Sequence, residues 1–121
     1  MSEHTEHRRF TRIPFDATTR LEQKGREWTV HLIDISFKGF LIESTELDDV
    51  DPIHPFEARI ELSREATVRM KAELRHRKGT HLGFACEQID MASMEHLRRV
   101  IELNLADSTK IERELHELIE V

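Results

Sequence analysis

The sequence contains one cysteine, Cys86, among 121 residues. A single cysteine cannot form an internal disulfide, and the common thiolate zinc and redox motifs need at least two. The eight histidines are scattered, two of them at His4 and His7, without the thiolate or carboxylate partners of a metal site. We therefore expect no disulfide, no metal and no cofactor. Cys86 alternates with Phe84 in an apolar segment and is interpreted as a small core residue.

Long apolar runs are also missing. Residues 1–12 are almost wholly polar, and no stretch there resembles a signal peptide or is long enough to span a bilayer. We expect a cytoplasmic protein that does not insert into membranes.

Aromatic residues are scarce, and acidic residues outnumber basic ones. The chain has no tyrosine and one tryptophan, and its net charge is -6. A protein that coats DNA or RNA needs a broad positive surface, and single-strand binders add stacking aromatics. A small barrel with a basic face for single strands is an alternative, but the composition disfavours a nucleic-acid polymer as partner.

The overall composition indicates one folded domain. Hydrophobic residues make up 38% and charged residues 35% of the chain, which is polar but sufficient for a core at this length. No motif places a nucleophile beside a base or pairs two acids, so we expect a protein that is not an enzyme.

Short apolar segments predict about six strands. The segment 66–74 alternates apolar and polar residues without a break, as a half-buried strand does. Turns are expected at Lys24-Gly25 and at Lys78-Gly79-Thr80. The predicted strands are 13–23, 27–35, 39–43, 56–62, 66–74 and 82–86.

The spacing changes to a helical period after residue 90. Apolar residues recur at helical intervals between residues 92 and 105, with Asp90 or Ser93 as the cap. A second amphipathic helix is expected from about Asp107-Ser108 onward. Sequential short strands need closure or cover to hide their edges, so we predict a mainly β, closed or nearly closed antiparallel barrel with one or two C-terminal helices.

Two polar clusters carry the chemistry. The first is the basic run 7–12, with Arg8, Arg9 and Arg12, whose guanidinium groups fit phosphates and the O6/N7 edge of guanine. The second is the segment 34–39. Its Asp34 and Ser36 lie two apart on a strand and share a face, where they can accept hydrogen bonds from guanine.

In this order and at this separation, the two clusters resemble the signature of the PilZ family, Arg-x-x-x-Arg followed by Asp/Asn-x-Ser-x-x-Gly. Residues 8–12 and 34–39 match its two halves. The resemblance implies a six-stranded barrel that binds cyclic di-GMP on its outside. It assigns ligand contacts to Arg8, Arg9, Arg12, Asp34, Ser36 and Gly39, and it divides the chain into a flexible arm, 1–12, and one PilZ domain, 13–121.

The resemblance also draws attention to His76 and Gly83. Some relatives carry a large aromatic near the position of His76, where it packs on a guanine, and Gly83 would shape the ligand face. An imidazole offers less area for stacking, and His76 is equally consistent with a surface residue beside Arg75, Arg77 and Lys78.

Two outputs follow from the resemblance. The first is a receptor in which ordering of the arm on cyclic di-GMP creates a surface for a downstream protein partner. The alternative is a PilZ-fold adaptor that works through its C-terminal helix with little ligand binding. The unbroken arginine and Asp-Ser-Gly motifs favour the receptor. Whether one ligand molecule or a stacked pair binds stays open.

Overall fold

The computed structural model of the chain describes residues 12–104, which form seven strands followed by one helix. The elements are β1 (Ile13–Pro14), β2 (Thr18–Gln23), β3 (Arg26–Ser36), β4 (Gly39–Glu43), β5 (Phe56–Ser63), β6 (Ala66–Lys78), β7 (His81–Ile89) and α2 (Met91–Asn104).

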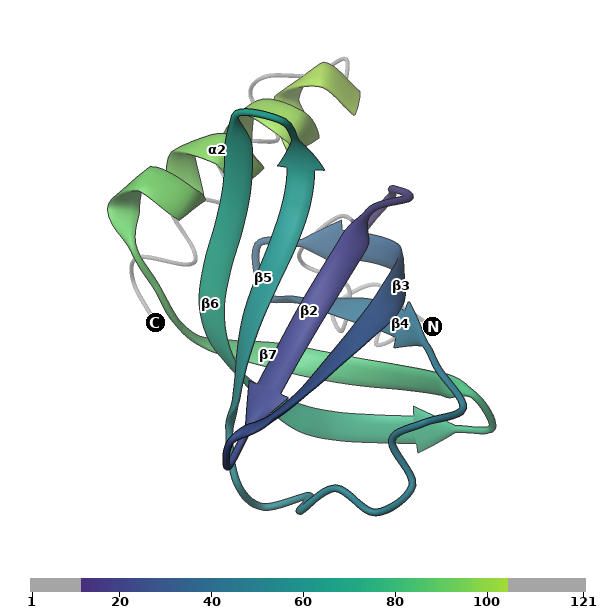
Figure 1. The fold of residues 1–121 in the computed structure, drawn as a ribbon. Coiled ribbons are helices and arrows are strands. Elements are labelled where there is room, and N and C mark those ends of the chain that lie inside the picture. Colours follow the sequence, from purple (N-terminus) through teal and green to yellow (C-terminus); the bar gives the residue numbers. More distant parts are fainter. Residues whose placement is uncertain (1–11, 105–121) are drawn as a thin grey trace, which may run out of the picture.

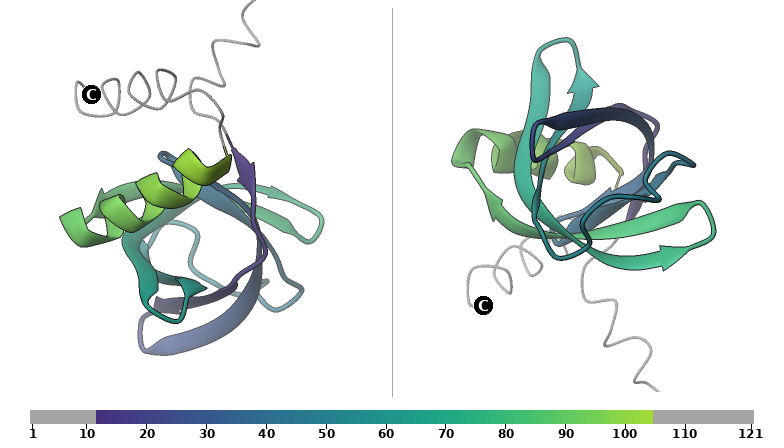
Figure 2. Two further views of the ribbon diagram at one scale, coloured as in Figure 1. Left: turned by 90° about the horizontal axis from the view of Figure 1, so that it is seen from above. Right: turned by 60° about the horizontal axis from the view of Figure 1, so that its bottom comes forward.

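Six of the strands close into a barrel. The antiparallel order is β3-β2-β5-β6-β7-β4, and β4 pairs back with β3, while the short β1 adds to β3. Figures 1 and 2 show this ring from the side and from its ends. The predicted six-stranded antiparallel barrel is confirmed. Within residues 12–104, each of these six strands therefore has a partner on both sides, which hides the strand edges.

Both predicted hairpin turns are present. Lys24 and Gly25 both have positive φ, 52° and 80°, as a two-residue type I′ turn requires. Gly79, with φ 61°, turns the chain between β6 and β7. The sequence analysis predicted that the strand beginning at Ala66 ends at residue 74. In the structure this strand, β6, continues to Lys78. The alternation breaks there since Arg75 is an extra residue in the pairing with β7.

A similar bulge in β3 decides which way the candidate site residues face. Leu32 pairs with Ile42 and Asp34 with Leu41, so Ile33 is an extra residue opposite β4. The buried apolar positions before the bulge are even-numbered, and after it Ile35 lies in the core. The bulge therefore turns Asp34 outward, although Leu32 two residues earlier points inward.

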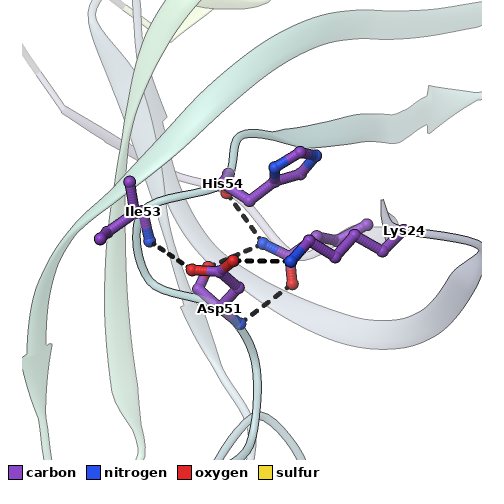
Figure 3. Close-up of polar contacts among 5 residues, drawn as sticks. Lys24, Asp51, Ile53 and His54 are labelled. Atoms are coloured by element: carbon purple, nitrogen blue, oxygen red, sulfur yellow. Dashed lines mark hydrogen bonds and ion pairs between the residues drawn. The ribbon is translucent and has the colours of Figure 1, made fainter.

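The two ends of the barrel are covered differently. The segment 44–55 lies at the end opposite α2 (Figure 1) and buries Leu47 and Val50. The buried Gln23 holds it, because its Nε2 donates to the carbonyls of Asp51 and His54 at 2.8 Å each and its Oε1 accepts from Asp51 N. Figure 3 shows the Asp51 carboxylate between Ile53 N and Lys24 Nζ, at 3.0 and 2.7 Å.

Helix α2 packs against β6 and buries Leu97 and Ile101. The two candidate caps have separate tasks. Asp90 Oδ1 accepts from Ser93 N at 2.6 Å and is the cap, while the buried Ser93 Oγ accepts from Arg69 N of β6 and docks the helix. The second predicted helix and Leu105 lie outside the described residues. Within residues 12–104, no helix is long and apolar enough to cross a membrane.

Candidate functional site

Two rows of side chains cross four neighbouring strands on the outside of the barrel. In the first row, Asp34 of β3, Leu41 of β4, Gly83 of β7 and His76 of β6 are successive register partners. In the second, Ser36 is followed by Gly39, Ala85 and Glu73. Neighbouring strands lie about 4.8 Å apart, so a row of four strands spans about 14 Å. Polar groups lie at the ends of the rows, and small residues occupy most of the middle.

These rows form the floor of a hollow of about 310 Å³. Six of the eight predicted ligand contacts line it, and the other two, Arg8 and Arg9, lie outside the described residues. The residues that line it are Arg12, Asp34, Ser36, Lys38, Gly39, Phe40, Leu41, Arg75, His76, Gly83, Phe84 and Ala85. The structure thus brings together residues that are up to 73 positions apart in the chain.

Arg12 reaches the hollow because β1 pairs with β3. Ile13 is the register partner of Ile35 and Pro14 that of Asp34. This pairing brings Arg12 beside the end of β3, and its Nε lies 3.5 Å from Asp34 Oδ2. The guanidinium side chain is 54% exposed and the carboxylate only 11%, so much of the guanidinium surface is accessible to a ligand.

Burial governs the chemistry of Asp34. It raises the pKa of the carboxyl above its ordinary value of 3.8, and the guanidinium of Arg12 opposes part of that rise. A largely desolvated carboxylate gains strongly from any further hydrogen-bond donor. Asp34 is therefore a suitable acceptor for the paired N–H groups of a ligand base.

Ser36 and Lys38 belong to the turn between β3 and β4, beside the second row. Lys38 N donates to Ser36 Oγ at 3.1 Å, and Cys86 N donates to Lys38 O at 2.7 Å. These bonds fix the turn against β7. The hydroxyl of Ser36 keeps its own proton to donate, so it can act as a donor as well as an acceptor.

The two glycines of the hollow have different roles. A Cβ on Gly39 would lie 2.0 Å from the carbonyl oxygen of Phe84, so only glycine lets β4 approach β7 here. A Cβ on Gly83 would meet nothing closer than His76 Cβ at 3.4 Å, which is ordinary contact. Gly39 thus serves the fold, and Gly83 leaves the floor of the hollow open.

Sequence reasoning did not place Lys38, Leu41, Arg75 and Ala85 in the site. Leu41 and Ala85 could have been found from strand register, because they are the partners of Asp34 and Gly39 across β4 and β7. Arg75 could not, since a plain alternation puts it on the opposite face from His76. The bulge brings both of them to the hollow.

The charge of the hollow favours an anionic ligand. Arg12, Lys38 and Arg75 line it together with a single carboxylate, Asp34. Within residues 12–104, no three His, Cys, Asp or Glu side chains are grouped so that they could hold a metal ion. Cys86 is half-buried against the core, and burial raises the pKa of its thiol, so it is a poor nucleophile.

The sequence matches the PilZ domain family over residues 6–103, and the chain belongs to this family. PilZ domains are binding domains and not a known catalytic family. The match begins before Arg8 and ends within α2, so it includes both halves of the signature.

Solved structures show the same fold. The inhibitor of motility MotI/DgrA of Bacillus subtilis has a TM-score of 0.65 at 15% identity, over 83% of this chain and 53% of its own, so this chain spans about half of that protein. The PilZ domain of CeSA from a cellulose synthesizing bacterium has 0.62 at 16%, over 78% and 99%. The PilZ domain of Escherichia coli YcgR, in a structure with c-di-GMP, has 0.63 at 17%, over 93% and 97%.

Proposed function

We propose that this chain is a receptor for cyclic di-GMP and binds it in the hollow between Arg12 and His76. The observation that carries the proposal is the meeting of Arg12, Asp34 and Ser36 in one open, positively charged hollow. A guanine ligand with two phosphates needs both an acceptor for base N–H groups and cations for its charge. The YcgR PilZ domain, which resembles this chain in fold, was solved with that ligand.

The residues divide the work by their chemistry. The Asp34 carboxylate accepts from the ring and amino N–H groups of a guanine, and the Ser36 hydroxyl adjusts beside it. Arg12 contacts phosphate oxygens or the O6/N7 edge of the base. Gly83 leaves room for the ligand over the floor, and His76 packs against its far side.

Arg8 and Arg9 belong to the same proposal through the signature motif. They precede the strand that places Arg12 at the hollow, so they can reach a ligand seated there. Their engagement changes the surface around the hollow when the ligand binds. A downstream protein partner that recognises only the changed surface would receive the signal.

Titration calorimetry with cyclic di-GMP tests the proposal on the wild type and on Arg12→Ala and Asp34→Ala. Each substitution is expected to lower the affinity at least about 30-fold, because truncating one partner of a charged contact that the ligand buries costs about 2–5 kcal/mol. Arg20→Ala is the matched control, since Arg20 lies on β2 and pairs with Glu61 away from the hollow.

GMP and GTP serve as ligand controls, and thermal unfolding shows that each variant is folded. Unchanged affinity in both Arg12→Ala and Asp34→Ala would reject the site. A folded wild-type protein that does not respond to cyclic di-GMP would reject the function.

A further inference from the structure

Arg75 lies at the end of the hollow away from Arg12. It belongs to β6, which is separated from β3 by β4 and β7 around the barrel. Arg75 is the extra residue of a bulge between the pairs Leu74–Phe84 and His76–Gly83. Its side chain therefore does not follow the regular inward–outward alternation of the strand. The bulge therefore adds a guanidinium to the hollow beside His76.

Glu73 holds this guanidinium in place. Arg75 Nε donates to Glu73 Oε1 at 2.8 Å, while the Arg75 side chain remains 65% exposed. The hydrogen bonds of Glu73 with Glu87 and with Arg75 lower the pKa of Glu73, so its carboxylate is the charged partner of Arg75. This contact occupies one of the five N–H donors of the arginine, and the others can serve a ligand.

The chemistry of this end of the hollow differs from that of the Asp34 end. Glu73 is the register partner of Ala85, and its carboxylate is bonded to Arg75. Arg75 is among the residues that line the hollow and Glu73 is not. A guanine edge needs donors and acceptors together, as Asp34 and Ser36 provide. An end lined by an arginine whose neighbouring carboxylate is already bonded to it suits a phosphate instead.

We propose that Arg75 is a second phosphate-binding residue of the site, so that a ligand with two phosphates is held by guanidinium groups at both ends of the hollow. The proposal rests on the proposed binding of cyclic di-GMP and names a contact outside the signature motif. A ligand with a guanine but one phosphate, such as GMP, engages one end only. Arg75 therefore contributes to selection of the cyclic dinucleotide over mononucleotides.

The test is calorimetry with cyclic di-GMP on the full chain and on Arg75→Ala, Arg75→Lys and Arg77→Ala. Arg75→Ala is expected to weaken binding about 10- to 100-fold, the effect of losing a charge-assisted contact. Arg75→Lys should recover most of the loss, because an ammonium serves phosphate as a point charge but cannot replace the bidentate fork at a base edge.

Arg77→Ala is the matched control because it removes the same charge from the same strand. Arg77 donates to Leu47 O at 2.6 Å and does not line the hollow. The affinity of the Arg77→Ala variant for cyclic di-GMP should equal that of the wild type. The loss in Arg75→Ala should also shrink as the salt concentration rises, because a partly exposed ionic contact is screened.

Three results would overturn the inference, and they are distinguishable. If Arg75→Ala binds like the wild type while Asp34→Ala does not bind, Arg75 takes no part and the receptor function stands. If Arg75→Lys is as weak as Arg75→Ala, the residue reads a base edge and the phosphate assignment is wrong. If the folded wild type does not bind cyclic di-GMP, the proposed function itself fails.

Discussion

Gly83 of β7 and His76 of β6 are register partners, and a Cβ on Gly83 would lie 3.4 Å from the Cβ of His76. The glycine is thus not required by the packing of these two strands. Its missing side chain instead keeps the middle of the floor open between Asp34 and His76. Gly83 therefore differs from Gly39, where a Cβ would lie 2.0 Å from the Phe84 carbonyl oxygen and the fold itself requires glycine.

We predict that Gly83→Leu abolishes binding of cyclic di-GMP without unfolding the barrel. The larger side chain fills the floor of a hollow of about 310 Å³, whereas the β-strand backbone accepts leucine readily. Calorimetry measures the affinity, and a thermal melt close to that of the wild type shows that the fold is kept. Binding of normal strength in Gly83→Leu would place the ligand elsewhere.

Gly39→Ala is the contrasting variant. Its Cβ would meet the Phe84 carbonyl oxygen at 2.0 Å, so β4 and β7 must separate. We expect this smaller substitution to lower the melting temperature far more than Gly83→Leu. Equal melting temperatures would show that the two glycines do not differ as described.

Asp34 links stability to pH. Burial raises its folded-state pKa above the ordinary 3.8, so at pH values between the two the native state binds more protons than the unfolded state. The free energy of unfolding must then fall as the pH rises through this window and stay lower above it. Asp34→Asn has no such titration. We predict that it is more stable than the wild type at pH 7, and that the difference closes as the pH falls below about 4.

Urea unfolding of both proteins between pH 7 and pH 3.5 measures this difference. When both proteins also carry Arg12→Ala, the stability difference at pH 7 should be larger, since the Arg12 guanidinium offsets part of the effect of burial on Asp34. A gap that grows on acidification would contradict the sign of the pKa shift. Asp34→Asn should also bind cyclic di-GMP weakly, so at position 34 stability and binding oppose each other.

Gln23 is expected to stabilise the barrel through the segment 44–55. Gln23→Ala removes three hydrogen bonds and leaves the backbone groups of Asp51 and His54 without their partner. We predict a loss of about 1–3 kcal/mol in the free energy of unfolding. Urea unfolding at neutral pH measures it.

Lys24→Met is the control for this region because it removes the exposed Lys24–Asp51 ion pair and leaves Gln23 in place. Exposed ion pairs contribute little, so its loss should be clearly smaller than that of Gln23→Ala. A loss as large as that of Gln23→Ala would mean that the ion pair, and not the buried amide, holds the segment.

The local patterns of the sequence predicted the elements well. Alternation identified the β6 segment from Ala66, the Lys24-Gly25 pair predicted the hairpin turn, and the helical period predicted α2 with Asp90 among its candidate caps. These features depend on residues within a few positions of each other. The placement of Arg12, Asp34 and Ser36 in one hollow also agrees with the motif, whose role in binding stays a prediction.

The errors and omissions have one physical origin. The strand predicted to end at residue 74 continues to Lys78, because a bulge at Arg75 is tolerated when β7 supplies the partners. Gln23 reads as an ordinary polar strand residue, yet it is 5% exposed and bonded to residues 28 to 31 positions away. Pairing between distant segments decides both, and no local pattern records it.

The sequence by itself determined a PilZ domain: the spacing of apolar residues specifies strands and a helix, and the two halves of the signature are contiguous. The tertiary structure decided which side chains share the hollow. A bulge reverses the facing of every residue after it, and its position depends on strand register. That is why Asp34 faces outward after the inward Leu32, and why Arg75 joins His76 at the far end of the site.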